Sequence, residues 1–257
     1  MLGEQAGNPD HLNKVAQVTL VFWIIKIAAT TLGETGGDAL SMTEHLGYAV
    51  SSIIFLAFFI ISVTAQIRAK SFQPFLYWSV IVATTTAGTT IADFADRSLG
   101  IGYVGGSLIL FTTLMLVLGL WRFTLGSVSV NYITSPKVEM FYWTTILLSN
   151  TLGTALGDFL ADSSGLGYER GALVFAGAIV FVAAAYFFSR ISRTMLFWVA
   201  FILTRPLGAT VGDFLTKAHA NGGLHLSRID SSFIIMLFIV ACIPLTAQKA
   251  GSYVRRR

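Results

Sequence analysis

The chain has 257 residues, of which 54% are hydrophobic and only 12% are charged, and its mean hydropathy is +0.72. Because soluble domains carry about 25% charged residues, this composition excludes a soluble globular protein. The formal net charge of +4 does not indicate nucleic-acid binding, since the basic residues lie in short segments between apolar runs, where orientation in a membrane explains them.

Two kinds of apolar segment alternate along the chain. Helices that carry a Gly/Thr/Asp motif are predicted over residues 14–40, 74–95, 138–161 and 193–216. Plainly apolar helices are predicted over residues 48–66, 103–122, 170–189 and 230–248. A membrane span needs about 20 such residues. The sequence therefore predicts an all-α membrane protein with eight transmembrane helices.

The motif helices repeat with fixed internal spacing. A glycine lies 10 residues after a tryptophan and an aspartate lies 15 residues after it, in four copies. The tryptophans are Trp23, Trp78, Trp143 and Trp198, the glycines are Gly33, Gly88, Gly153 and Gly208, and the aspartates are Asp38, Asp93, Asp158 and Asp213. A further glycine follows each tryptophan after 24 residues, at Gly47, Gly102, Gly167 and Gly222. Such spacing indicates a repeated structural unit.

We predict one membrane domain made of four pseudo-repeats of two helices each. The repeats cover approximately residues 14–68, 72–123, 137–190 and 192–248, and residues 124–136 form a polar linker between two halves. Each repeat crosses the membrane an even number of times, so all copies enter from the same side. The repeats are then related by an axis along the membrane normal, which favours a closed ring of helix pairs.

The distribution of Lys and Arg predicts the orientation in the membrane. One side would hold Lys14, Arg68, Lys70, Arg122, Lys137, Arg190, Arg193, Lys249, Arg255, Arg256 and Arg257, and the other side Arg97, Arg170, Lys217 and Arg228. Eleven cations against four place both chain termini in the cytoplasm by the positive-inside rule.

Oxygen-bearing side chains recur along one face of three motif helices. Residues four and seven before the aspartate share its helix face. These positions hold Glu34 and Thr31 before Asp38, Thr89 and Thr86 before Asp93, and Thr154 and Thr151 before Asp158. Carboxylates and hydroxyls are hard ligands that suit Mg²⁺, Ca²⁺, Mn²⁺, Na⁺ or protons. The four aspartates, together with the threonine stripe, are therefore a candidate ion pathway, and Asp93 and Asp158 are candidate metal ligands.

The fourth repeat departs from the others at Arg205 and Pro206. Proline inside a helix removes a hydrogen bond and predicts a kink or break. An arginine at mid-membrane needs a carboxylate partner, and Glu34 is the natural candidate because the other repeats lack that acid. Lys26 is a second cation inside a predicted span. Arg205, Glu34 and Lys26 are either a coupling or gating set or a structural ion pair that fixes the register of the repeats.

A packing role for the same motif stays open. Gly-x-x-x-Gly lets membrane helices approach closely, and threonine hydroxyls can donate to their own helix. The aspartates lie near helix ends, where they could be solvated or accept a hydrogen bond from a tyrosine of the same repeat, for example Asp158 from Tyr168. Under this reading the protein is a non-transporting sensor or assembly protein.

No signature of an enzyme occurs: the sequence lacks H-E-x-x-H, G-x-S-x-G and a P-loop. The signature Leu-Gly-x-x-x-Gly-Asp-Phe at residues 152–159, the recurrent tryptophan and the opening segment 12–26 resemble a family of bacterial membrane proteins. That family is described as four tandem copies of a two-span repeat of unknown function. The resemblance implies eight spans and an inner-membrane location, and it brings no substrate.

The sequence thus predicts a cation transporter or channel of the bacterial cytoplasmic membrane, not an enzyme. Its expected partners are the lipid bilayer and a small inorganic ion, with Mn²⁺ as a guess from ligand hardness, and a homo-oligomer is compatible with the sequence. No cofactor is predicted beyond a candidate bound divalent cation. The alternative is the interaction protein described above.

Overall fold

A computed structural model describes residues 14–130, 133, 135–246 and 248–251. In this part of the chain eight long helices form and no strand does. The four motif helices are α1 (Leu20–Asp38), α3 (Pro74–Asp93), α5 (Pro136–Asp158) and α7 (Arg193–Thr216). The plainly apolar helices are α2 (Gly47–Arg68), α4 (Gly102–Leu125), α6 (Gly167–Phe188) and α8 (Arg228–Leu245).

Local sequence signals set the helix ends. Thr19 caps α1 by accepting a hydrogen bond from the backbone N–H of Phe22, Ser135 caps α5 in the same way, and proline opens α3. After the motif aspartate, the first three repeats continue into a π-helical turn: η2 (Ala39–Thr43), η3 (Phe94–Ser98) and η5 (Phe159–Ser163). The fourth repeat has instead an extended Lys217 and the short 3₁₀ turn η6 (His219–Asn221).

The glycine that follows each tryptophan after 24 residues has a conformational role. Gly47, Gly102, Gly167 and Gly222 all have φ between +73° and +79°. Side chains with a Cβ rarely adopt this left-handed conformation. The recurring glycine therefore turns the chain between the motif helix and the helix that follows it.

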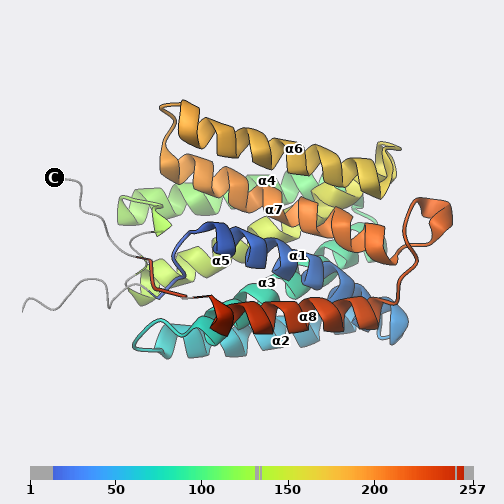
Figure 1. Cartoon of the computed structure of the whole chain (residues 1–257), viewed down its shortest axis with the longest axis horizontal. Helices are drawn as coiled ribbons and strands as arrows, with labels where there is room; N and C mark the ends of the chain where they lie inside the picture. Colours follow the sequence, from blue (N-terminus) through green and yellow to red (C-terminus); the bar gives the residue numbers. More distant parts are fainter. Residues whose placement is uncertain (1–13, 131–132, 134, 247, 252–257) are drawn as a thin grey trace, which may run out of the picture.

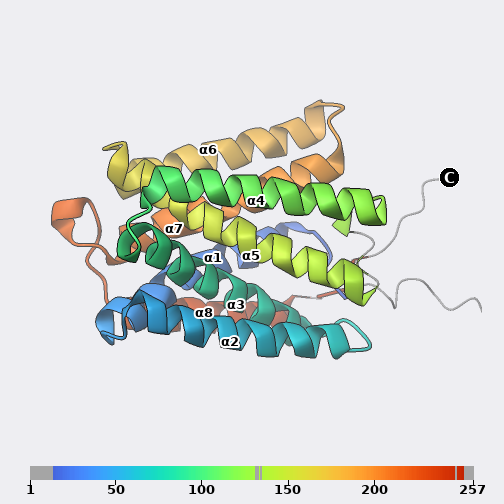
Figure 2. The same cartoon turned by 180° about the vertical axis from the view of Figure 1, so that it is seen from behind.

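The four motif helices form a closed ring inside the bundle. Contacts run from α1 to α3, α3 to α5, α5 to α7 and α7 back to α1. Each outer helix packs on the motif helix of the next repeat, so that α2 lies on α3, α4 on α5, α6 on α7 and α8 on α1. In Figures 1 and 2, α4 and α6 cover one side of the ring and α2 and α8 the other.

The outer helices present their apolar side chains to the surroundings. Within an apolar stretch of 18 residues, 72% of the residues are buried in α3 and 67% in α7. In α4, α6 and α8 the buried share of such a stretch is 17%. Six of the eight helices are long and apolar enough to cross a membrane: α2, α3 extended through η3, α4, α6, α7 and α8. An apolar exterior of this extent, around a buried ring, is that of a multi-pass membrane protein.

One end of the ring is apolar and aromatic. Trp78, Trp143 and Trp198 are buried in one hydrophobic cluster, and Trp23 packs against it. The described ends of the chain meet at this end, where the backbone N–H of Gln17 donates to the carbonyl of Lys249. The four tryptophans therefore have a packing role, which explains why all four repeats of this fold carry one at the same position.

Glycines bring the motif helices into close contact around the whole ring. A Cβ on each motif glycine would meet the residue eight positions before the aspartate of the next motif helix. The pairs are Gly33 with Thr85, Gly88 with Asn150, Gly153 with Arg205 and Gly208 with Thr30. The same contact recurs at all four interfaces, so the ring has pseudo-fourfold symmetry and its interior is packed.

We expect Gly33→Ala to lower the stability of the folded protein by about 1–3 kcal/mol, the usual effect of overpacking. The new Cβ would lie 2.5 Å from Thr85 Cβ and 2.9 Å from the backbone carbon of Thr85, which cannot move independently. The matched control is Gly119→Ala on α4, where the new Cβ would meet nothing within 4 Å apart from the adjoining backbone of its own helix. Thermal unfolding in detergent measures the stability of the two variants. Equal melting temperatures for Gly33→Ala and Gly119→Ala would contradict a tight interface at Gly33.

The sequence predicted a kink or a break at Pro206. The break does not occur, since α7 is one helix from Arg193 to Thr216. Gly153 of α5 leaves room for the proline ring, because a Cβ there would lie 2.9 Å from Cδ of Pro206. The proline ring thus occupies a site that glycine leaves open on the neighbouring helix.

Candidate functional site

Residues four apart lie on one side of a helix. Counted from the aspartate, we follow positions −8, −4 and 0 of the motif helices and position +4 in the turns that come after them. Position −8 holds Thr30, Thr85, Asn150 and Arg205; position −4 holds Glu34, Thr89, Thr154 and Ala209; position +4 holds Met42, Arg97, Asp162 and Lys217. Together with the four aspartates, we call these residues the axial column.

Arg205 fills the middle of the axial column and is fully buried. Its Nη2 donates to Oε2 of Glu34 at 3.0 Å, to the hydroxyl of Thr154 at 2.7 Å and to the hydroxyl of Thr89, and its Nη1 donates to the carbonyl of Thr30 at 3.1 Å. The predicted Glu34 partner is confirmed. One arginine thus holds all four repeats together at their centre.

Lys26 lies toward the apolar end and has no carboxylate partner among the described residues. Its Nζ donates to Oδ1 of Asn150 at 3.3 Å and lies 4.3 Å from the ring centre of Phe201. The amide of Asn150 donates in turn to the hydroxyl of Thr84 at 2.9 Å. An amide oxygen and an aromatic face can hold a desolvated ammonium group, so Lys26 stabilises this layer without joining the acidic one.

The four motif aspartates are buried, each at most 2% exposed, and every one contacts a cation. Arg97 bridges Asp93 at 2.9 Å and Asp158 at 3.0 Å. Lys217 bridges Asp38 at 2.9 Å and Asp213 at 3.0 Å, and Nε of Arg228 lies 3.5 Å from Asp38. The layer is therefore two acid–cation–acid bridges and not four solvated carboxylates.

Arg97 and Lys217 are the residues that the sequence interpretation missed, since it placed both in loops. Both lie four residues after a motif aspartate, and this spacing puts them on the same helix face. Burial alone would lower the pKa of Lys217, but the carboxylates of Asp213 and Asp38 raise it well above its ordinary value. Lys217 therefore carries its charge at neutral pH.

The predicted threonine stripe divides into two groups. The hydroxyls of Thr89 and Thr154 face Arg205 in the axial column. The hydroxyls of Thr31, Thr86 and Thr151 donate to the carbonyl four residues earlier in their own helix, at 3.0, 3.0 and 2.9 Å. Position −4 rather than −7 therefore supplies hydroxyls to the column.

The proposed hydrogen bond from Tyr168 to Asp158 does not form. The Tyr168 hydroxyl donates instead to Oδ1 of Asp162 at 2.7 Å, and the Tyr103 hydroxyl donates to Oδ2 of the same residue at 3.3 Å. Asp158 is turned inward to Arg97. The tyrosines therefore position the rim acid, not the buried one.

Three acids lie close enough to share a cation. Ligand oxygens of Glu34, Asp38 and Asp213 all lie within 4.8 Å of one another, and all three residues are buried. Hard cations such as Mg²⁺, Ca²⁺ and Mn²⁺ prefer such carboxylate oxygens, so the donor set fits one. The sequence instead favoured Asp93 and Asp158, which Arg97 already bridges.

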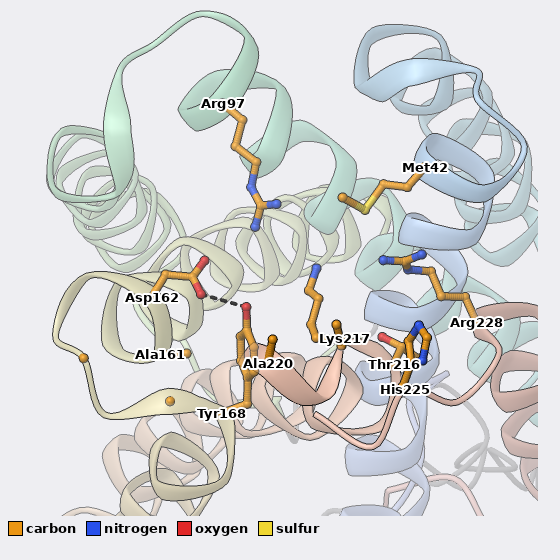
Figure 3. A pocket seen from close by; sticks show the side chains of 13 residues that line it. Met42, Arg97, Ala161, Asp162, Tyr168, Thr216, Lys217, Ala220, His225 and Arg228 are labelled. Atoms are coloured by element: carbon orange, nitrogen blue, oxygen red, sulfur yellow. Dashed lines mark hydrogen bonds between the residues drawn. The ribbon is translucent and has the colours of Figure 1, made fainter. Parts of the chain in front are cut away.

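Two cavities lie at opposite ends of the motif helices. The outer cavity, of about 740 Å³, lies beyond the aspartates, and the charged ends of Arg97, Lys217 and Arg228 extend toward it, opposite Asp162 (Figure 3). The inner cavity, of about 330 Å³, lies at the apolar end and is lined by the residue before each motif tryptophan: Phe22, Tyr77, Tyr142 and Phe197. The packed axial column separates the two.

Comparisons with known proteins agree with the repeats seen in sequence and structure. A family model described as a repeat of unknown function, DUF347, matches residues 21–72, 76–126, 141–192 and 196–247. No curated protein and no solved structure gives a significant match. The four matches cover most of the chain and coincide with the four helix pairs. The chain belongs to the DUF347 family of tandem repeats of unknown function.

Proposed function

We propose that the protein is a cation transporter of the bacterial cytoplasmic membrane, with the axial column as its pathway. All eight helices cross the membrane in this proposal, and both termini face the cytoplasm. The observation that carries it is a line of buried charged groups, through the middle of the bundle, between two cavities at opposite ends. Ionisable groups inside membrane proteins are costly and usually mark ion or substrate pathways.

The local charge favours a cation at the aspartate layer. Within the described part of the chain, the four buried carboxylates contact three cations, Arg97, Lys217 and Arg228, while Glu34 is paired with Arg205. One more positive charge, as an ion or a proton, would balance the layer. Because the buried Arg205 side chain fills the middle of the ring and glycines pack the helix interfaces tightly, a carrier with alternating access explains the geometry better than an open channel.

The second candidate is an interaction or sensor protein that uses the column only for packing. It is favoured by the contact of every motif aspartate with a cation of the chain. Such bridges can fix which faces of asymmetric repeats meet. In that case, replacing the bridging charges by neutral residues would change the stability of the protein, and the wild type itself would show no ion flux.

Flux into proteoliposomes separates the two functions. We expect selective uptake of one ion among Mn²⁺, Mg²⁺, Ca²⁺, K⁺, Na⁺ and H⁺ by the wild type, and at least about a tenfold loss in Asp93→Asn/Arg97→Gln/Asp158→Asn. That variant removes a whole bridge, so that no buried charge is left unpaired. The control is Arg170→Gln, an exposed cation near the same end. Absence of flux for every ion, from a protein that elutes as a folded species, would rule out the transporter.

Thiol labelling tests the topology. In a Cys242→Ser background, we expect Ala218→Cys, which lines the outer cavity, to react with an impermeant maleimide in intact cells. Ser71→Cys, exposed between α2 and α3, should react only after lysis, because the positive-inside rule places that loop in the cytoplasm. The reverse pattern would invert the orientation, and labelling of both from one side would contradict the odd number of spans, five, that the proposal places between them.

A further inference from the structure

We propose that the outer cavity binds a small organic solute that carries a carboxylate, and that Arg228 and Lys217 hold this carboxylate in place of Asp38. The binding step stands independently of the function proposed above.

Arg228 offers unused donors to the cavity. Its only ionic contact among the described residues runs from Nε to Asp38 at 3.5 Å, and within that part of the chain its two terminal nitrogens have no hydrogen-bond partner. The side chain is 25% exposed and lines the cavity. A guanidinium group presents two parallel N–H groups that match the two oxygens of a carboxylate. Arg228 is therefore an incomplete ion pair with its free edge toward the cavity.

Lys217 supplies the second donor. Its ammonium group has three N–H donors, and two of them are directed to Asp38 and Asp213. In Figure 3 the ammonium group of Lys217 and the guanidinium group of Arg228 converge on the same part of the cavity. The third donor of Lys217 can therefore meet an anion that Arg228 binds.

The rest of the cavity lining suits an organic solute. Met42, Ala218 and Ala220 provide apolar surface, and the ring of Tyr168 forms part of the opposite wall. The volume of about 740 Å³ lies within the range of small-molecule sites, and most of the lining is polar, which suits a solute that joins a charged group to a small apolar part. An inorganic anion alone would leave this apolar surface unused.

Asp38 is the group that the solute would replace. Among the described residues, its Oδ2 is contacted by both Lys217 and Arg228, at 2.9 and 3.5 Å. An external carboxylate held by the free donors of these two side chains competes with Asp38 for both cations, while Asp38 stays buried beside Glu34 and Asp213. A buried carboxylate that loses its cations is strongly unfavourable, so Asp38 opposes binding of the solute. The geometry thus makes Asp38 the internal competitor of the external carboxylate.

Equilibrium binding to the protein in nanodiscs tests the site, with radiolabelled acetate, succinate and inorganic phosphate as probes. We expect saturable binding of at least one carboxylate, at least about tenfold weaker in Arg228→Gln and unchanged in the exposed control Arg170→Gln. The proposal is overturned if neither carboxylate binds saturably, if only phosphate binds, or if Arg228→Gln binds the carboxylate as the wild type does.

The exchange with Asp38 has its own readout. Asp38→Asn should bind the carboxylate more tightly than the wild type does, because the competing acid is gone. Equal or weaker binding in a folded Asp38→Asn variant would refute the exchange. Neither binding measurement depends on ion flux. Absence of flux would therefore not contradict the binding site, and absence of carboxylate binding would not contradict ion transport.

Discussion

Replacing Arg205 by methionine is expected to lower the stability of the folded protein by about 3–5 kcal/mol. The change leaves the carboxylate of Glu34 fully buried without its cation. It also removes the hydrogen bonds to Thr30 and Thr154, on the helices that flank α7. The measurement is thermal or denaturant unfolding of the purified protein in nanodiscs.

A second change separates the charge from the packing. The double variant Arg205→Met/Glu34→Gln removes both charges, so we expect it to recover much of the lost stability, since an apolar replacement of a buried pair is often tolerated. The exposed control Arg170→Met should unfold like the wild type. If the double variant were no more stable than Arg205→Met, the arginine would act through its shape and hydrogen bonds, not through its pairing with Glu34.

Replacing Lys217 by glutamine is expected to destabilise the protein by a similar amount, about 3–5 kcal/mol, and to make its stability depend on divalent cations. Asp38 and Asp213 then lose the ammonium group between them, and together with Glu34 they form a group of three buried acids within 4.8 Å. A cation that binds the folded state at 100 times its dissociation constant restores about 2.7 kcal/mol. Melting temperatures with and without millimolar Mn²⁺, Mg²⁺ or Ca²⁺ measure this.

The matched control is Lys137→Gln, at an exposed lysine near the start of α5. It should neither lower the melting temperature nor create a response to cations. A Lys217→Gln variant that is destabilised but insensitive to all three cations would show that the three acids do not form a metal site when Lys217 is absent. The wild type should respond weakly, because Lys217 already occupies the position between Asp38 and Asp213.

The sequence by itself determined the repeat, the helix count and the central ion pair. Fixed spacing from each tryptophan to its glycine and aspartate can be read directly, because equivalent residues of a repeat keep equivalent places. The pairing of Glu34 with Arg205 was also predictable, since a cation within an apolar span needs an acid and only the first repeat has one at that position. The composition was enough to predict a membrane protein.

Only the tertiary structure decided what the aspartates contact. Local spacing could place Arg97 and Lys217 on the faces of Asp93 and Asp213, but their second partners, Asp158 and Asp38, come from helices that are distant in the sequence. The same holds for Lys26, whose partner Asn150 lies 124 residues away, and for Pro206, whose ring packs against Gly153 of α5. Helix periodicity fixes the direction of a side chain on its own helix, whereas the order of the helices around the ring fixes which group it meets.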